Sequence, residues 1–333
     1  MAGVSISRRA FTLLEMMAAL AISSVIATAA IVAFVNVSRS TRRVEQQAHA
    51  DEEAKLLVEY LVSNAQQAAG GSVRPWMGIQ VDNNTSAACA ATVTIGAIVV
   101  PVCNGSDRLH ILMLDPTPAQ CTIQTAAAGS VTVCPGAAGC AGTCCLVAAQ
   151  HQGKDIVLVP PEGGPDQGQW RSTFCTAVNA AACSCALGGG QSAYSTPGAG
   201  AAAYSAGVLT VGTTWTVYLD RSDGILRLVA DTNGNGTPDL VELADHVADF
   251  QVQLGFDTNG DQVVDVYQAG YGGMSAANVR MINLGVIVQA PVAARDTLSK
   301  AQLFDGPVRS AARGFYLRAS ASKATLRNLD IFY

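Results

Sequence analysis

The strongest pattern of hydrophobic and polar positions lies near the N-terminus. From Met16 to Val35 there are 20 residues without a charged side chain, directly preceded by Glu15. A helical apolar segment of this length is about what is needed to cross the ~30 Å hydrocarbon core of a membrane. The pattern therefore predicts a helix that can span a bilayer and that carries a carboxylate at its head.

A second helical pattern continues this segment. Residues 36–69 contain neither proline nor glycine, and Gly70 and Gly71 then provide a stop signal. We predict one helix from Phe11 to about Ala69, on the order of 90 Å long at 1.5 Å per residue. It would pack partly on a globular head, with an exposed coiled-coil spacer as the alternative. The apolar positions at helical spacing are Val44, Ala48, Leu56, Leu57, Tyr60, Leu61 and Ala65.

From Ser72 onward, short β-type runs alternate with glycine, proline and asparagine. Residues 221–224, RSDG, predict a turn between two strands. The expected fold class is α+β, with a long N-terminal helix followed by a β-sheet-rich head over residues 70–333. The runs predicted as strands are 91–102, 108–115, 155–161, 214–220, 224–230, 250–256, 279–290 and 314–319.

All ten cysteines lie in the middle part of the chain, largely in segments rich in alanine and glycine. This density indicates an oxidising compartment, where cysteines form disulfides. We expect insertions at about residues 116–150 and 175–207 to be loops ordered by disulfides rather than by a core. A zinc site built from four of the cysteines is the alternative. The disulfide candidates, whose pairing the sequence leaves open, are Cys89, Cys103, Cys121, Cys134, Cys140, Cys144, Cys145, Cys175, Cys183 and Cys185.

Three interpretations of the N-terminal segment compete. A secretory signal would use Arg8 and Arg9 as its basic region and residues 27–29, Ala-Thr-Ala, as its cleavage site. A plain membrane anchor explains the length of the apolar run. Neither accounts for Glu15, because an ionisable group inside a membrane segment costs on the order of a few kcal/mol unless it is paired. The third interpretation rests on residues 8–15, RRAFTLLE.

These eight residues resemble the N-terminal signal of type IV pilins and of the pseudopilins of type II secretion. The resemblance implies that a prepilin peptidase cleaves between Ala10 and Phe11 on the cytoplasmic side of the membrane. Phe11 would become an N-methylated N-terminus, and Glu15 would take the acidic position used in assembly. Residues 1–10 would then be a leader peptide, and residues 11–35 the transmembrane and filament-core part of the helix. Ala10 departs from the pattern, since such signals usually have glycine before the cut.

Charge pairing favours this third interpretation. Cleavage would create an ammonium group on Phe11, four residues before Glu15. The two charges could then pair along one helix or between neighbouring subunits. Processing would therefore create an ammonium partner for Glu15 that does not exist in the precursor.

Residues 231–242, DTNGNGTPDLVE, place oxygen donors at the spacing of an EF-hand-type calcium loop, with Gly236 at the turn position. Hard oxygen ligands at flexible spacing suit calcium, and zinc is disfavoured because no histidine or cysteine lies nearby. Pro238 departs from a standard EF-hand. A β-turn is the alternative, because Asp, Asn and Gly favour turns. The predicted ligands are Asp231, Asn233, Asn235, Thr237 through its carbonyl group, Asp239 and Glu242.

A second stretch, residues 257–268, repeats the opening of this pattern. Gln262 occupies the turn position, and Gln268 occupies the position of the bidentate glutamate. Calcium and a plain turn are equally supported here, so one or two calcium ions are expected in total. The candidate ligands are Asp257, Asn259, Asp261 and Asp265.

Four further segments, residues 104–114, 155–164, 240–267 and 314–333, resemble minor pilins of the PilW type. The resemblance implies a single-pass precursor in the inner membrane, which an inner-membrane assembly platform would extract. The subunit would join other pilins in an extracellular type IV pilus, near its tip or in its priming complex. A minor pseudopilin of a type II secretion system and a pilus-tip adhesin are the alternatives.

Other kinds of chemistry are not indicated. A formal charge of −5 with only 14% charged residues provides no basic surface for nucleic acid. The chain has neither a phosphate-binding glycine loop nor a nucleophile elbow, and its four histidines are far apart in sequence. We therefore expect a structural subunit and not an enzyme.

Overall fold

The structure is a computed structural model of the chain. Two compact units, residues 1–49 and residues 50–333, are each described separately. The residues that the structure describes are 13–68, 78–83, 93–95, 98–100, 105–114, 121–127, 129–133, 146–159, 171–187, 192–193, 207–220, 223–230, 239–271, 274, 278–290, 299–304, 306, 308–310 and 315–326. The predicted residues outside this part are Ala10, Phe11, Asp231, Asn233, Asn235, Thr237, Cys89, Cys103, Cys134, Cys140, Cys144 and Cys145.

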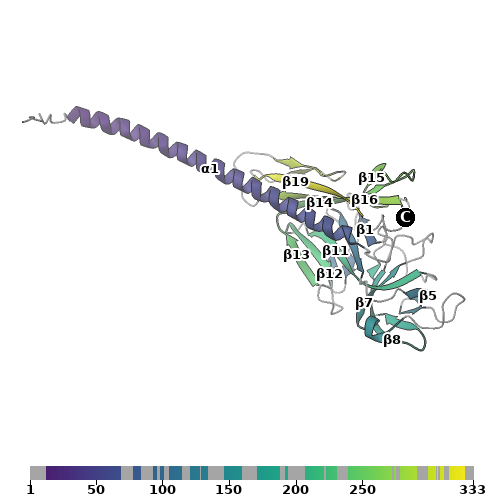
Figure 1. Ribbon diagram of the computed structural model, residues 1–333. Helices are drawn as coiled ribbons and strands as arrows, with labels where there is room; N and C mark the ends of the chain where they lie inside the picture. The colour runs from purple at the N-terminus through teal and green to yellow at the C-terminus, as the bar shows by residue number, and fades with distance from the viewer. Residues whose placement is uncertain are drawn as a thin grey trace, which may run out of the picture. The chain divides into compact units, whose positions relative to one another are not determined.

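Helix α1 (Leu13–Gln66) runs for 54 residues (Figure 1). At 1.5 Å per residue it is about 80 Å long. The predicted end at Ala69 is slightly late, because Gln67 and Ala68 already form a tighter turn. The Gln67 amide donates to Asn64 O (3.0 Å) and the Ala68 amide to Ala65 O (3.2 Å). Such i to i−3 bonds satisfy the last carbonyls of a helix.

The part of α1 that follows Ala50 belongs to the head. One stripe of this part is buried, and it lies in the main hydrophobic core together with strands of both large sheets. The prediction that the helix packs partly on the head is confirmed, and burying such a stripe against a core is what stabilises it. The buried helix residues are Ala50, Ala54, Leu57, Val58, Leu61 and Ala65.

Two large antiparallel sheets form most of the head. The first follows the order β1-β4-β11-β5-β6-β9-β8-β10, with β7, β12 and β13 paired beside this path. Its strands are β1 (Ile79–Asp82), β4 (Arg108–Leu114), β5 (Cys121–Ala127), β6 (Ser130–Val133), β7 (Lys154–Val159), β8 (Arg171–Asn179), β9 (Ser184–Leu187), β10 (Ser192–Ala193), β11 (Gly207–Asp220), β12 (Ile225–Ala230) and β13 (Asp239–Ala244).

The second sheet has the order β15-β14-β16-β19. Its strands are β14 (Val247–Phe256), β15 (Val266–Gln268), β16 (Val279–Gln289) and β19 (Leu317–Thr325). The remaining elements are the pair β2 (Val93–Ile95) and β3 (Ile98–Val100), the pair β17 (Lys300–Ala301) and β18 (Arg309–Ser310), and the short helix α2 (Ala148–His151). The predicted α+β class is confirmed.

Strand β11 connects two cores. Its first residues, 207–211, pair with β5 and β7, and its later residues, 212–220, pair with β4 and β12. Leu209 and Val211 lie in a small core with the cysteine-rich strands, whereas Val217 and Leu219 lie in the main core. One long strand therefore ties the cysteine-rich region to the rest of the head.

The expectation that the cysteine-rich segments are loops without a core is wrong for their described parts. Strands β5, β6, β8 and β9 surround a small apolar core of their own. Its fully buried members include Ile123, Val131 and Val133. These strands are not predicted from the sequence because cysteine and alanine, rather than larger apolar residues, occupy many of their positions.

Candidate functional site

The N-terminal part of α1 presents an uninterrupted apolar surface. Every side chain from Leu13 to Val37 is exposed, with Leu13 at 80% and Phe34 at 73%. Among the described residues, α1 is the one helix long and apolar enough to cross a membrane. An exposed apolar surface of this size is not stable in water, so the segment is suited to lipid or to other apolar helices.

Two side chains inside this segment, Ser24 and Thr28, have their hydroxyl groups hydrogen-bonded to the helix itself. Ser24 Oγ donates to Ala21 O (2.7 Å), and Thr28 Oγ1 donates to Ser24 O (2.8 Å). Both side chains can therefore enter an apolar environment without leaving an unpaired donor.

Glu15 lies in the first turn of α1 and is exposed. A negative charge at this place is favoured by the helix dipole, because the first backbone amides of a helix carry a partial positive charge. The predicted cleavage site, Ala10 and Phe11, lies just before the described part of the chain.

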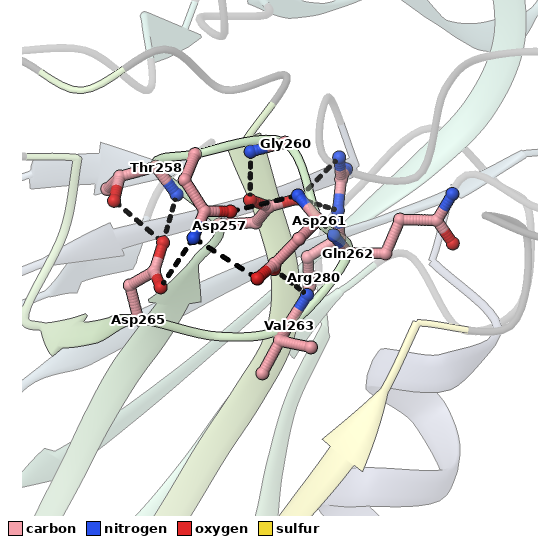
Figure 2. A network of polar contacts seen from close by, with 9 residues as sticks. Asp257, Thr258, Gly260, Asp261, Gln262, Val263, Asp265 and Arg280 are labelled. Atoms are coloured by element: carbon pink, nitrogen blue, oxygen red, sulfur yellow. Dashed lines mark hydrogen bonds and ion pairs between the residues drawn. The ribbon is translucent and has the colours of Figure 1, made fainter.

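The second predicted calcium loop is a closed turn between β14 and β15 (Figure 2). Asp257 is buried, and its two oxygens accept hydrogen bonds from the amides of Gly260 (2.6 Å) and Gln262 (2.9 Å). Gln262 has a positive φ of 69°, so it adopts the conformation for which a calcium loop normally uses glycine at this position. The backbone thus follows the predicted pattern, and the Asp257 carboxylate holds it there.

The other predicted ligands of this loop also bond within the chain. Asp261 Oδ1 accepts from the Val263 amide (2.8 Å), and Asp261 Oδ2 accepts from Asn259 Nδ2 (3.1 Å). Asp265 Oδ2 accepts from both the amide and the hydroxyl of Thr258, each at 2.7 Å. The hydroxyl bond from Thr258 is the main cause of a pKa below the usual range for Asp265.

Arg280 of β16 supplies a positive charge to the same turn. Its Nε and Nη2 atoms each lie 3.2 Å from Asp257 Oδ2. Burial alone would raise the pKa of Asp257, but the two loop amides and Arg280 together lower it. The guanidinium thus supplies a positive charge beside Asp257, and the structure brings the predicted ligands together around internal donors (Figure 2).

The first predicted calcium loop is only partly described. Its last four residues are not loop but the start of β13, because Asp239 pairs with Ala230 of β12. Glu242 lies opposite Arg227, with Oε1 3.6 Å from Nη2. Residues three apart on a strand point to opposite faces. The side chains of Asp239 and Glu242 therefore do not converge on one ion, as a twelve-residue calcium loop requires. Arg227 lies beside Glu242 instead.

Within the described part of the chain, no group of three or more His, Cys, Asp or Glu side chains is placed to hold a metal ion. Four of the predicted ligands, Asp231, Asn233, Asn235 and Thr237, belong to the connection between β12 and β13, which is not described.

A buried charged cluster that the sequence did not reveal joins β14 to its surroundings. Asp249 is fully buried, and its Oδ1 accepts from Ser106 Oγ (2.6 Å), the Phe250 amide (3.0 Å) and Arg309 Nη2 (2.9 Å). Gly105 O accepts from the same Arg309 atom (2.8 Å). The only sequence signal for this cluster is the charged residue Asp249 within the β-type run "HVADFQVQ". That signal does not indicate Arg309, 60 residues away, as its partner.

A second cluster that was not predicted lies on β1, β4 and β11. His110 is fully buried, with Nδ1 2.9 Å from Thr216 Oγ1 and Nε2 3.1 Å from Asp82 Oδ2. A neutral ring that donates from Nε2 to Asp82 and accepts at Nδ1 from the Thr216 hydroxyl satisfies both ring nitrogens. Arg108 also donates to Asp82 (2.8 Å). The order of groups resembles a nucleophile, base and acid, but Thr216 is fully buried, so a substrate has no access.

The pKa shifts of this cluster follow from burial and charge. Burial lowers the pKa of His110 below 6.5, against the opposing effect of Asp82. Burial would raise the pKa of Asp82, but His110 and Arg108 hold it far below the usual range. The cluster therefore keeps Asp82 ionised and His110 neutral inside the sheet.

Each of the four described cysteines is in a disulfide. Cys175 of β8 is bonded to Cys185 of β9, and Cys121 and Cys183 are also disulfide-bonded. This agrees with the prediction of disulfides in these segments. The bond between Cys175 and Cys185 lies in the small core and connects two neighbouring strands.

A comparison with protein-family models matches residues 6–31 to the prokaryotic N-terminal methylation motif. The match includes the predicted cleavage site, Glu15 and most of the apolar run. Together with the apolar α1, the match supports a type IV pilin-like N-terminal segment, and such a signal implies processing by a prepilin peptidase from a membrane-anchored precursor. Comparisons with curated proteins and with solved structures found no match.

Proposed function

We propose that this protein is a minor pilin of the PilW type, a subunit that is incorporated into a type IV pilus or that primes its assembly. The observation that carries the proposal is the methylation motif at residues 6–31, followed by an apolar helix that continues into a β-sheet head. The large head and its disulfides suit an exposed position in an extracellular filament.

In this proposal the exposed apolar part of α1 first lies in the inner membrane and then packs against the helices of neighbouring pilins. Glu15 pairs with the ammonium group of Phe11 on a neighbouring subunit, because a carboxylate without a partner is costly in an apolar filament core. The pair would fix the axial position at which the subunit is incorporated.

The experiment is to measure the incorporation of a Glu15→Leu variant into sheared filaments. We expect cleavage of the leader and membrane insertion to continue and incorporation to fall at least tenfold. Glu45→Gln is the matched control, since Glu45 is also an exposed acid of α1 but lies beyond the apolar run. Normal incorporation of the Glu15 variant would contradict the proposal. Incorporation only into a type II secretion filament would favour the alternative, a minor pseudopilin.

We also propose that one calcium ion binds the connection between β12 and β13. Asp231, Asn233 and Asn235, the carbonyl group of Thr237, and Asp239 would supply the oxygens. The second loop is left out because Arg280 already provides its positive charge. Ion binding to the folded state stabilises it by about 2.7 kcal/mol at a concentration 100 times the Kd.

The calcium proposal is tested by thermal unfolding of the mature protein with calcium and with a chelator. Calcium should raise Tm, and Asp231→Ala should abolish this increase. Asp261→Ala, in the second loop, should leave the increase intact. Equal Tm values with calcium and chelator would contradict calcium binding, and loss of the effect only in the Asp261 variant would assign the ion to the second loop.

A further inference from the structure

Three arginines follow the apolar segment of α1 within little more than one turn. Arg39, Arg42 and Arg43 are all exposed, and no described residue forms an ion pair or hydrogen bond with their side chains. Their spacing of three and four residues places them on one face of the helix. The result is a compact patch of positive charge without a partner among the described residues.

The position of this patch matches the edge of a membrane. The uncharged run from Met16 to Val35 spans about 30 Å as a helix, the thickness of the hydrocarbon core. Arg39 begins four residues later, about 6 Å further along the axis. Arginine side chains at this depth extend into the layer of lipid phosphates, and their planar guanidinium groups pair with phosphate oxygens in a bidentate manner.

Cleavage before Phe11 would leave these arginines as the basic side chains that flank the membrane segment. It removes Arg8 and Arg9, and Arg39, Arg42 and Arg43 are then the only arginine or lysine residues before Lys55. Apart from the ammonium group of Phe11 on the cytoplasmic side, the positive charge next to the membrane would then lie on its outer face. Anionic headgroups attract each basic residue near the surface with an energy that corresponds to about a fivefold enrichment.

We propose that Arg39, Arg42 and Arg43 bind the phosphate groups of anionic lipids in the outer leaflet of the inner membrane. They would hold the processed subunit at a fixed depth until it is extracted into a filament. The proposal rests on the membrane-inserted stage of the proposed function.

The test is native mass spectrometry of the mature, full-length protein released from mixed bilayers of phosphatidylglycerol and phosphatidylcholine with identical acyl chains. We expect phosphatidylglycerol to predominate among the retained lipids by at least fivefold. The triple variant R39Q/R42Q/R43Q should retain both lipids equally. Lys55→Gln is the matched control, because Lys55 is an exposed cation of the same helix but lies about 30 Å beyond Val35. It should leave the preference unchanged.

An unchanged lipid preference in the triple variant, or an equal loss in the Lys55 variant, would overturn the proposal. So would an absence of preference combined with lost cross-linking between subunits in the triple variant, since the arginines would then bind an acidic surface of another pilin. Intact masses from the same spectra report leader cleavage, so failure of the lipid site and failure of the proposed function are distinguishable.

Discussion

At the scale of single residues, Asp249 shows how the head holds charges in its interior. Ser106, the Phe250 amide, Gln251 and Arg309 all donate to the same oxygen of this fully buried side chain. Burial of a carboxylate is costly, and only such a set of donors offsets the cost. The cluster stabilises the contact between β14 and the segments that carry Ser106 and Arg309.

Asp249→Ala should lower the free energy of unfolding by about 3 to 5 kcal/mol, because Arg309 would remain in the interior without its main counter-charge. Asp51→Ala provides the control. Asp51 forms an ion pair with Arg318 at 3.2 Å, but its side chain is 56% exposed, so the loss should stay within about 1 kcal/mol. Urea denaturation measures both, and similar losses in the two variants would contradict this role of Asp249.

His110 should make stability depend on pH. Its folded-state pKa lies below 6.5 because the ring is buried, so the unfolded chain takes up a proton more readily. Stability from this group is therefore fully present above about pH 6.5 and is lost as the pH falls towards the folded-state pKa. Urea midpoints at pH 7.5 and 5.5 should differ less in His110→Gln than in the unaltered protein. The control is His246→Asn, at a half-exposed histidine, which should leave the difference between the two midpoints unchanged. A smaller difference in the His246 variant than in the His110 variant would contradict the assignment of the pH dependence to His110.

These buried groups could not be predicted from the sequence. Asp249 and Arg309 are 60 residues apart, and Asp82 and His110 are 28 apart. Each pair is brought together only by the sheets. That Asp257 and Asp265 belong to one loop could be predicted, since they are close in sequence. Their actual partners were not predicted, because the role of Arg280 depends on the pairing of β14 with β16.

At the scale of elements, the helix and the strands rich in large apolar residues could be predicted, and the cysteine-rich strands could not. Each of the eight predicted runs overlaps a strand, although the run 91–102 corresponds to the two strands β2 and β3 rather than to one. Their β-branched and aliphatic residues give a clear signal. In β9 the buried residue is Cys185, and Ala186 lies beside it. These side chains are too small to produce the alternation of large apolar and polar residues by which a strand is predicted.

The disulfide between Cys175 and Cys185 should stabilise the small core. Replacing both cysteines by alanine should lower the free energy of unfolding of this region by about 2 to 5 kcal/mol, through lost cross-linking of the unfolded chain and lost packing. Hydrogen exchange should accelerate in β8 and β9 and remain unchanged in β14 and β16, which lie in the other sheet. Equal acceleration in both sheets would contradict the existence of a separate small core.

At the scale of the whole molecule, the chain combines an apolar helical segment with a head that has its own core. All side chains from Leu13 to Val37 are exposed, whereas residues 50–333 form a compact unit. This division of the chain is what a subunit needs if it moves from a membrane into a filament while its head remains folded in water.

Removal of residues 1–37 should therefore give a monomer that is soluble without detergent and whose Tm is close to that of the full chain. The removed residues contribute exposed apolar surface but no part of the described cores. Size-exclusion chromatography and thermal unfolding measure the two properties. Aggregation of the shortened chain, or a decrease in Tm of more than about 2 to 4 °C, the shift that about 1 kcal/mol produces in a domain of roughly 150 to 250 residues, would contradict this division.

The most direct test of the central claim is the intact mass of the mature protein from cells that carry a prepilin peptidase. A pilin-like subunit should begin at Phe11 and carry one additional methyl group on its N-terminus. A chain cut after Ala29, or one that keeps residues 1–10 in the presence of the peptidase, would contradict it.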